Sequence, residues 1–170
     1  MKTIMNKIVT VITCLLLFGV IAAIINLNND TIKAVKKLYA ENAETLDCIN
    51  TYLDSERFDE YDVIRIDLFD LTAKIECSKK DEIDGGYKTS VFTENEMVEH
   101  LDNLRGKNFV IVLKENNYIY YQTKGTFNKS VGLIFSPNEE PHISEYKTLN
   151  QVLEMLNSAG WYYIKTIYDE

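Results

Sequence analysis

The sequence predicts an α+β protein in which an antiparallel sheet of about five to seven strands packs against two or three helices, behind an N-terminal transmembrane helix. Three observations predict this class. An apolar stretch without charge stands near the N-terminus, several later segments alternate apolar and polar residues as half-buried strands do, and others repeat apolar residues at helical spacing. These segments divide the chain into an anchor, a connecting helix and one folded domain.

The stretch from Ile8 to Leu27 holds 20 residues and no charge. At about 1.5 Å of rise per residue, a helix of that length spans about 30 Å, the thickness of the hydrocarbon core of a bilayer. We therefore expect a single-pass signal anchor that binds the protein to the cell membrane. Residues 1–7, which include Lys2 and Lys7, are expected to form a short cytoplasmic tail.

The shortness of that tail favours an extracytoplasmic position for the rest of the chain, because a short N-terminal tail most often stays inside the cell. The lysines after the span, Lys33, Lys36 and Lys37, balance those before it and do not decide the orientation. An alternative is a signal peptide that is cleaved near Ala22 or Ala23 and releases a secreted domain. The apolar run continues past these alanines, and this favours the uncleaved anchor.

Residues 28–56 are expected to form an amphipathic helix or stalk. Side chains recur along one stripe after Thr31 at alternating steps of three and four residues. The stripe consists of Ile32, Val35, Tyr39, Asn42, Leu46, Ile49 and Leu53. Two copies of the chain can associate through such a stripe as a coiled coil. Because this one is short and carries a polar Asn42, we favour an ordinary amphipathic helix that packs on the domain.

Residues 57–170 are predicted to form a soluble α+β domain. Its first strand is indicated by Ile64 and Ile66, which alternate with charged residues. A second strand, from about Ala73 to Cys77, is expected to form a hairpin with the first. A short third strand follows a polar turn and runs from Tyr87 to Phe92.

Two capping boxes predict helices in this domain. The first begins at Thr93 and predicts a short helix that ends near Gly106. The second begins at Thr148 and predicts a helix that Gly160 ends by adopting the left-handed conformation. The expected buried stripe of this second helix consists of Leu149, Val152, Leu153 and Leu156.

Residues 109–121 are predicted to form a hairpin at the centre of the sheet. Two asparagines stand between its apolar halves, and asparagine tolerates the positive φ that a two-residue turn requires. Such a turn sets a register in which Leu113 faces Tyr120 and Val112 faces Tyr121. Another strand is expected from Val131 to Phe135.

The end of the chain carries a resemblance. Leu156 and Asn157, followed by Gly160, Trp161 and an aliphatic strand, resemble the ending of several small bacterial domains of unknown function. Many of those domains are exported or anchored to the membrane. The resemblance covers this ending alone and implies a fold and a setting of that kind, without any catalytic residue.

The charge of the chain excludes one class of partner. The formal net charge is −8, from 26 acidic and 18 basic side chains. An acidic surface repels phosphate backbones, so we expect no nucleic-acid partner.

No pattern identifies a catalytic, cofactor-binding or metal-binding residue, so none is assigned. His100 and His142 do not stand at ligand spacing to another histidine or cysteine. Acidic clusters such as residues 81–84 are explained by solvated charge. Cys48 and Cys77 can pair as a disulfide in an extracytoplasmic domain, although we favour two free thiols.

A group of aromatic side chains is the most distinctive candidate for a binding surface. Because side chains alternate between the faces of a strand, some of these rings are expected to point away from the core, where they can stack on a sugar, a peptide or a partner protein. The alternative, which we favour, is packing within the sheet. The group consists of Tyr118, Tyr120, Tyr121, Trp161, Tyr162 and Tyr163.

These observations predict a single-pass bacterial membrane protein whose acidic extracytoplasmic domain binds another protein, as an accessory or immunity-type module does. Heavy use of Asn, Ile, Lys and Tyr suggests the bacterial source. One alternative is a protein of the cell envelope that binds glycan or hydrolyses it with two carboxyl groups. The other is the secreted domain that cleavage near Ala22 would release.

Overall fold

The computed structural model describes residue 13 and residues 31–69, 74–80, 86–93, 97–115, 117–126, 129–141 and 148–168. The chain divides into two compact units, Met1–Val35 and Lys36–Glu170. Apart from residue 13, the stretch from Ile8 to Leu27 lies outside the described residues, so its transmembrane helix stays a prediction. Within the described part of the chain, no helix combines the length and the apolar composition that crossing a bilayer requires.

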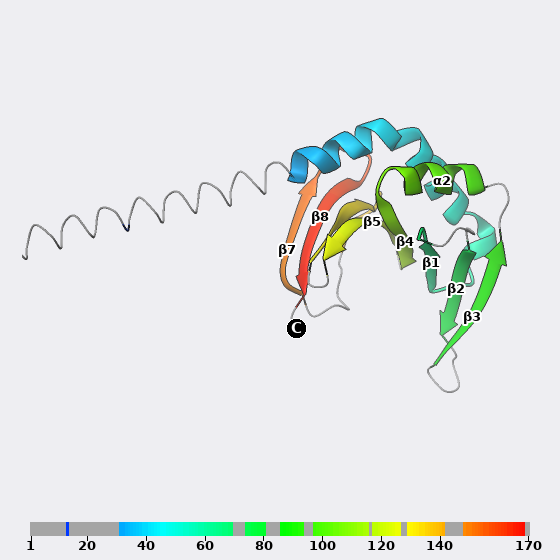
Figure 1. The fold of residues 1–170 in the computed structure, drawn as a ribbon. Coiled ribbons are helices and arrows are strands. Elements are labelled where there is room, and N and C mark those ends of the chain that lie inside the picture. The colour runs from blue at the N-terminus through cyan, green and yellow to red at the C-terminus, as the bar shows by residue number, and fades with distance from the viewer. Residues whose placement is uncertain are drawn as a thin grey trace, which may run out of the picture. The chain divides into compact units, whose positions relative to one another are not determined.

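The second unit is an α+β domain built on one antiparallel sheet (Figure 1). Its eight described strands follow the order β3-β2-β1-β4-β5-β6-β8-β7. Their bounds are Val63–Asp67 (β1), Lys74–Lys80 (β2), Tyr87–Thr93 (β3), Phe109–Glu115 (β4), Tyr118–Thr126 (β5), Lys129–Phe135 (β6), Thr148–Met155 (β7) and Trp161–Tyr168 (β8). This confirms the predicted class and the antiparallel sheet, which has one strand more than the upper end of the predicted range.

Two α-helices accompany the sheet among the described residues. The long helix runs through residues 31–53, of which residues 36–53 belong to the second unit. A short 3-10 helix, η1 (Glu56–Phe58), follows it, and α2 (Val98–Gly106) precedes β4. The predicted end of α2 is confirmed. Its start is later than predicted, because Met97 is the N-cap and Thr93 ends β3.

The stripe predicted for the long helix is its buried face. Leu46, Ile49 and Leu53 are fully buried. The polar position Asn42 is buried too, and its Nδ2 donates a hydrogen bond to the carbonyl oxygen of Leu38 at 2.8 Å. A coiled coil between two copies of the chain would have to bury these same side chains at its interface, but here they are part of the core of the domain.

Contacts at its two ends show how the long helix crosses the sheet from β7 to β4 (Figure 1). Near the start of the second unit, Lys36 Nζ lies 2.6 Å from Glu154 Oε1 of β7. At the other end, Lys114 Nζ of β4 donates a hydrogen bond to the carbonyl oxygen of Leu53 at 2.6 Å. One helix therefore contacts strands that lie four places apart in the sheet.

The predicted strand faces and hairpin register are confirmed. Ile64 and Ile66 of β1 are buried on one face. Leu113 pairs with Tyr120, and its neighbour Val112 pairs with Tyr121. The apolar alternation of these strands specifies the register, because a slip of one residue would turn every buried side chain toward the other face.

The second predicted helix is wrong, because residues 148–155 form strand β7. This strand pairs along its length with β8, for example Leu153 with Ile164. The helical spacing of its apolar residues is overridden by the backbone hydrogen bonds and packing that β8 supplies. Gly160 does adopt a positive φ of 88°, as predicted, but it stands in the turn between the two strands.

Candidate functional site

The aromatic residues considered as a candidate binding surface are buried or half-buried in the sheet. Tyr120 is half-buried, and the others, Tyr118, Tyr121, Trp161, Tyr162 and Tyr163, are buried. Tyr121 and Trp161 pack together with ring centroids 5.7 Å apart, and Trp161 also contacts Tyr39 of the long helix. On the other face of the sheet, Tyr118 and Tyr162 share an apolar cluster with neighbouring isoleucines. These residues therefore form no exposed aromatic surface, and packing within the sheet explains them.

The hydroxyl groups of Tyr121 and Tyr120 form hydrogen bonds with side chains in or next to the core. The Tyr121 hydroxyl donates to Asn50 Oδ1 at 2.6 Å, and burial raises the pKa of this hydroxyl well above its ordinary value of 10.0. On the other face, the Tyr120 hydroxyl donates to Ser130 Oγ at 3.0 Å, and Ser130 is hydrogen-bonded to Thr166. These contacts satisfy polar atoms in the core and offer no access to a ligand.

The two cysteines considered as a possible disulfide pair are free thiols. Cys48 is exposed on the long helix, whereas Cys77 is buried on β2. Burial raises the pKa of the Cys77 thiol to about 11, partly offset by the positive charge of Arg57. A buried thiol with a raised pKa is a poor nucleophile, so Cys77 is part of the packing.

An open groove of about 750 Å³ lies beside the exposed face of the long helix. We call it the helix groove. Its lining residues are Glu44, Asp47, Cys48, Thr51, Tyr52 and Met97. Its volume falls within the range of about 300 to 1,000 Å³ that is typical of ligand-binding pockets.

Helical geometry brings four of these side chains to one face of the long helix. Glu44, Asp47, Cys48 and Thr51 stand at positions i, i+3, i+4 and i+7, and all four are exposed. This stripe lies beside the buried stripe on the same helix. The spacing could have indicated the groove from the sequence, but Met97, which comes from a distant part of the chain, could not have been added to it.

Contacts around α2 hold the walls of the helix groove in place. Met97 is buried, and its carbonyl oxygen accepts a hydrogen bond from the Leu101 amide at 3.0 Å. Asn103 Nδ2 of α2 donates to Thr45 Oγ1 of the long helix at 3.1 Å. The second of these bonds joins α2 to the long helix beside the groove.

The charge of the helix groove is negative. Neither Glu44 nor Asp47 forms an ion pair with any described residue, in contrast to other acids on or next to the same helix. Glu41 Oε1 lies 3.6 Å from Lys37 Nζ, and Asp54 Oδ1 lies 2.8 Å from Lys114 Nζ. Two carboxylates beside the apolar surface of Met97 and Tyr52 suit a ligand that is both cationic and apolar.

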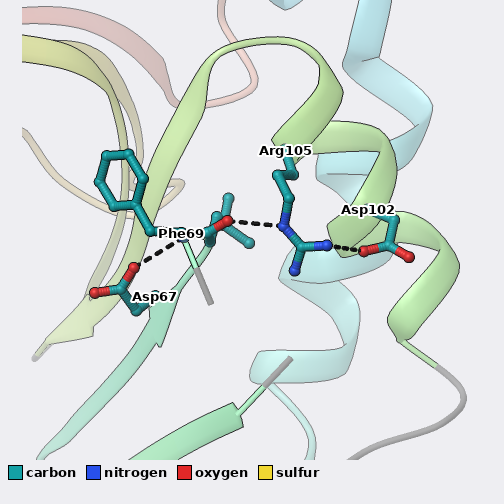
Figure 2. Close-up of polar contacts among 5 residues, drawn as sticks. Asp67, Phe69, Asp102 and Arg105 are labelled. Atoms are coloured by element: carbon teal, nitrogen blue, oxygen red, sulfur yellow. Dashed lines mark hydrogen bonds and ion pairs between the residues drawn. The ribbon is translucent and has the colours of Figure 1, made fainter. Parts of the chain in front are cut away.

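Phe69 is a second exposed feature, with 72% of the residue accessible to solvent. Figure 2 shows how the turn that carries it is held. The Phe69 amide donates to Asp67 Oδ1 at 2.9 Å, and Arg105 Nε donates to the carbonyl oxygen of Leu68 at 2.7 Å, while Arg105 also pairs with Asp102. Single exposed apolar side chains are common, and Phe69 by itself defines no site.

The described residues include no group of side chains that could hold a metal ion. No three His, Cys, Asp or Glu side chains among them are grouped closely enough to hold a metal ion. His100 lies half-buried on α2, and His142 falls outside the described residues. The helix groove is therefore the candidate site that the described part of the chain offers for a ligand. Comparisons with protein-family models, with curated protein sequences and with solved structures each find no match to this chain.

Proposed function

We propose that this chain is a single-pass bacterial membrane protein whose acidic extracytoplasmic domain binds another protein through the helix groove, as an accessory or immunity-type module. The observation that carries the proposal is the groove itself, which is open to solvent and is lined, beside apolar surface, by two carboxylates that pair with no described residue. A hydrogen bond between α2 and the long helix supports the walls of this groove, and walls that are held in place lose little conformational freedom when a partner is bound.

The proposed location rests on the uncharged stretch from Ile8 to Leu27. In intact cells, an external protease is expected to degrade the domain. Survival of the domain until the membrane is broken would contradict the extracytoplasmic position. The mass of the mature protein separates an anchor from a signal peptide cleaved near Ala22, because cleavage removes the N-terminal residues.

Site-specific photo-crosslinking in living cells tests the binding function. A photoreactive amino acid replaces Thr51 in the helix groove, and the matched control replaces Ala40, which is exposed on the same helix but does not line the groove. We expect a light-dependent adduct of discrete mass from position 51 that is absent from position 40. The additional substitution Cys48→Trp, which fills the groove, should abolish it.

The proposal fails if position 51 yields no adduct in a protein that retains its fold. It also fails if positions 51 and 40 yield the same set of adducts, because the groove would then have no selectivity. Trp161 is the single tryptophan of the chain and is fully buried, so its fluorescence reports the fold of the variants at positions 51 and 40. Cys48→Trp adds a second tryptophan, so circular dichroism reports the fold of that variant.

The alternative function, glycan binding or hydrolysis in the cell envelope, is supported by one observation. Glu44 and Asp47 line the same groove as the aromatic ring of Tyr52. Two carboxyl groups and an aromatic platform are the elements that a glycoside hydrolase uses. Release of soluble fragments from purified cell wall, lost in Glu44→Gln and Asp47→Asn, would favour this function over protein binding.

A further inference from the structure

The charges in the helix groove indicate the chemistry of its partner. This inference rests on the proposed function. Glu44 and Asp47 are exposed and have no described ion-pair partner, although Lys37 of the same helix pairs with Glu41. A carboxylate pair without a counter-ion among the described residues attracts a cationic group from outside.

The floor of the helix groove adds a second requirement. Tyr52 is half-buried and Met97 is 5% exposed, and both line the groove, where the apolar part of their side chains faces a ligand. A methionine side chain adapts to apolar groups of several shapes. A simple polyamine would satisfy the carboxylates but would leave this apolar surface uncovered.

The size of the helix groove limits how much of a partner it takes. A volume of about 750 Å³ accommodates a few side chains and leaves no room to enclose a whole folded element. Contact between the grooves of two copies of this chain is disfavoured, because each groove carries the same negative charge. The helix groove therefore fits a short segment of another protein.

We infer that the helix groove binds a protein segment in which lysine or arginine stands next to large aliphatic side chains. The basic groups pair with Glu44 and Asp47, and an aliphatic side chain lies on Met97 and Tyr52. The carboxylates act as charge contacts at the rim, so they set the salt dependence of binding and the choice of partner.

The test uses the full-length protein in zwitterionic nanodiscs and a fluorescent hexapeptide of alternating lysine and leucine. One comparison peptide has glutamate in place of lysine, and another has serine in place of leucine. We expect the lysine-leucine peptide to bind at least about tenfold more tightly than either comparison peptide, because each lacks one of the two required groups.

Two groove variants with matched controls locate the binding. Glu44→Gln with Asp47→Asn should weaken binding about five- to tenfold and reduce its salt dependence. The control, Glu139→Gln with Glu140→Gln, changes the net charge equally at exposed positions outside the groove and should leave affinity unchanged. Cys48→Trp should abolish binding, whereas Ala40→Trp should not.

Several outcomes would overturn the inference. Equal affinity for the lysine and glutamate peptides would show that the carboxylates do not select the partner. Binding that persists in Cys48→Trp would place the peptide on the lipid or elsewhere on the protein. A photo-adduct made of two copies of this chain would identify self-association instead.

Failure of the inference and failure of the proposed function are distinguishable. A groove-specific adduct to another protein, combined with no binding of the lysine-leucine peptide, would leave protein binding intact and refute the basic aliphatic segment. Peptide binding at the groove without any adduct in cells would instead leave the chemistry intact and refute the binding function.

Discussion

Two glycines of the domain stand where a side chain would collide with backbone atoms. A Cβ on Gly132 would collide with the carbonyl oxygen of Tyr121. A Cβ on Gly160 would lie 2.5 Å from Pro137 Cα, and the φ of Gly160 is also positive. At both positions the nearest atom belongs to the backbone, which cannot move aside as the end of a flexible side chain can.

Replacing Gly160 with alanine should therefore lower the free energy of unfolding by about 2 to 3 kcal/mol, from backbone strain and collision together. Urea unfolding of the full-length protein, followed by Trp161 fluorescence, measures this loss. The control is Gly106→Ala, where no heavy atom lies within 4 Å of the added Cβ, and it should stay within about 0.5 kcal/mol of the parent. Equal stability of the two variants would refute the collision.

Tyr121 supplies the second prediction at this scale. Its hydroxyl is fully buried and bonds Asn50 Oδ1, whose own Nδ2 is buried without a hydrogen-bond partner among the described residues. Tyr121→Phe removes that bond and leaves Asn50 with a further unsatisfied polar atom, so unfolding should become easier by about 1 to 2 kcal/mol. Tyr87→Phe, at an exposed position, is the matched control. No difference between the two variants would show that the Tyr121 hydrogen bond contributes nothing to stability.

At the scale of elements, β7 is a segment whose local pattern and tertiary state disagree. Its apolar residues recur at helical spacing, yet the segment pairs with β8 along most of its length. We expect a synthetic peptide of residues 147–160 to become helical in trifluoroethanol, because only the local preference then acts. Circular dichroism measures this. A shuffled peptide without the three- and four-residue spacing is the control, and equal helicity of both peptides would contradict the explanation.

The elements that were predicted correctly are those whose local pattern and packing agree. The long helix has a single apolar stripe, and that stripe packs on the sheet. The alternation of apolar residues determines the register between β4 and β5. The start of α2 was missed, because the capping-box pattern at Thr93 competes with the pairing of β3 to β2, which extends to that residue. Local sequence patterns predict helices and strands, and where two patterns overlap, as at Thr93, the pairing of strands decides which one forms.

At the scale of the whole molecule, buried ionisable groups predict sensitivity to alkaline pH. Burial raises the pKa of the Cys77 thiol from its ordinary value of 9.0 to about 11. Between these values the unfolded chain has lost a proton that the folded chain keeps, so the free energy of unfolding falls as pH rises. Burial also raises the pKa of Tyr121 and Tyr163, which extends the loss above pH 10.

Urea unfolding between pH 8 and 11 checks this prediction. Cys77→Ala should be less stable than the parent at pH 8, because it leaves a cavity, but its stability should fall less steeply between pH 9 and 11. Identical slopes in the two proteins would show that the Cys77 thiol does not contribute to the pH dependence.

By itself, the sequence determined the α+β class, the buried stripe of the long helix and the central hairpin register, because each follows from the spacing of apolar residues along a short segment. Only the tertiary structure decided that β7 is a strand, that the aromatic rings are buried on both faces of the sheet, and that Met97 joins four exposed positions of the long helix in one groove. These depend on residues far apart in the chain, whose approach no local pattern encodes.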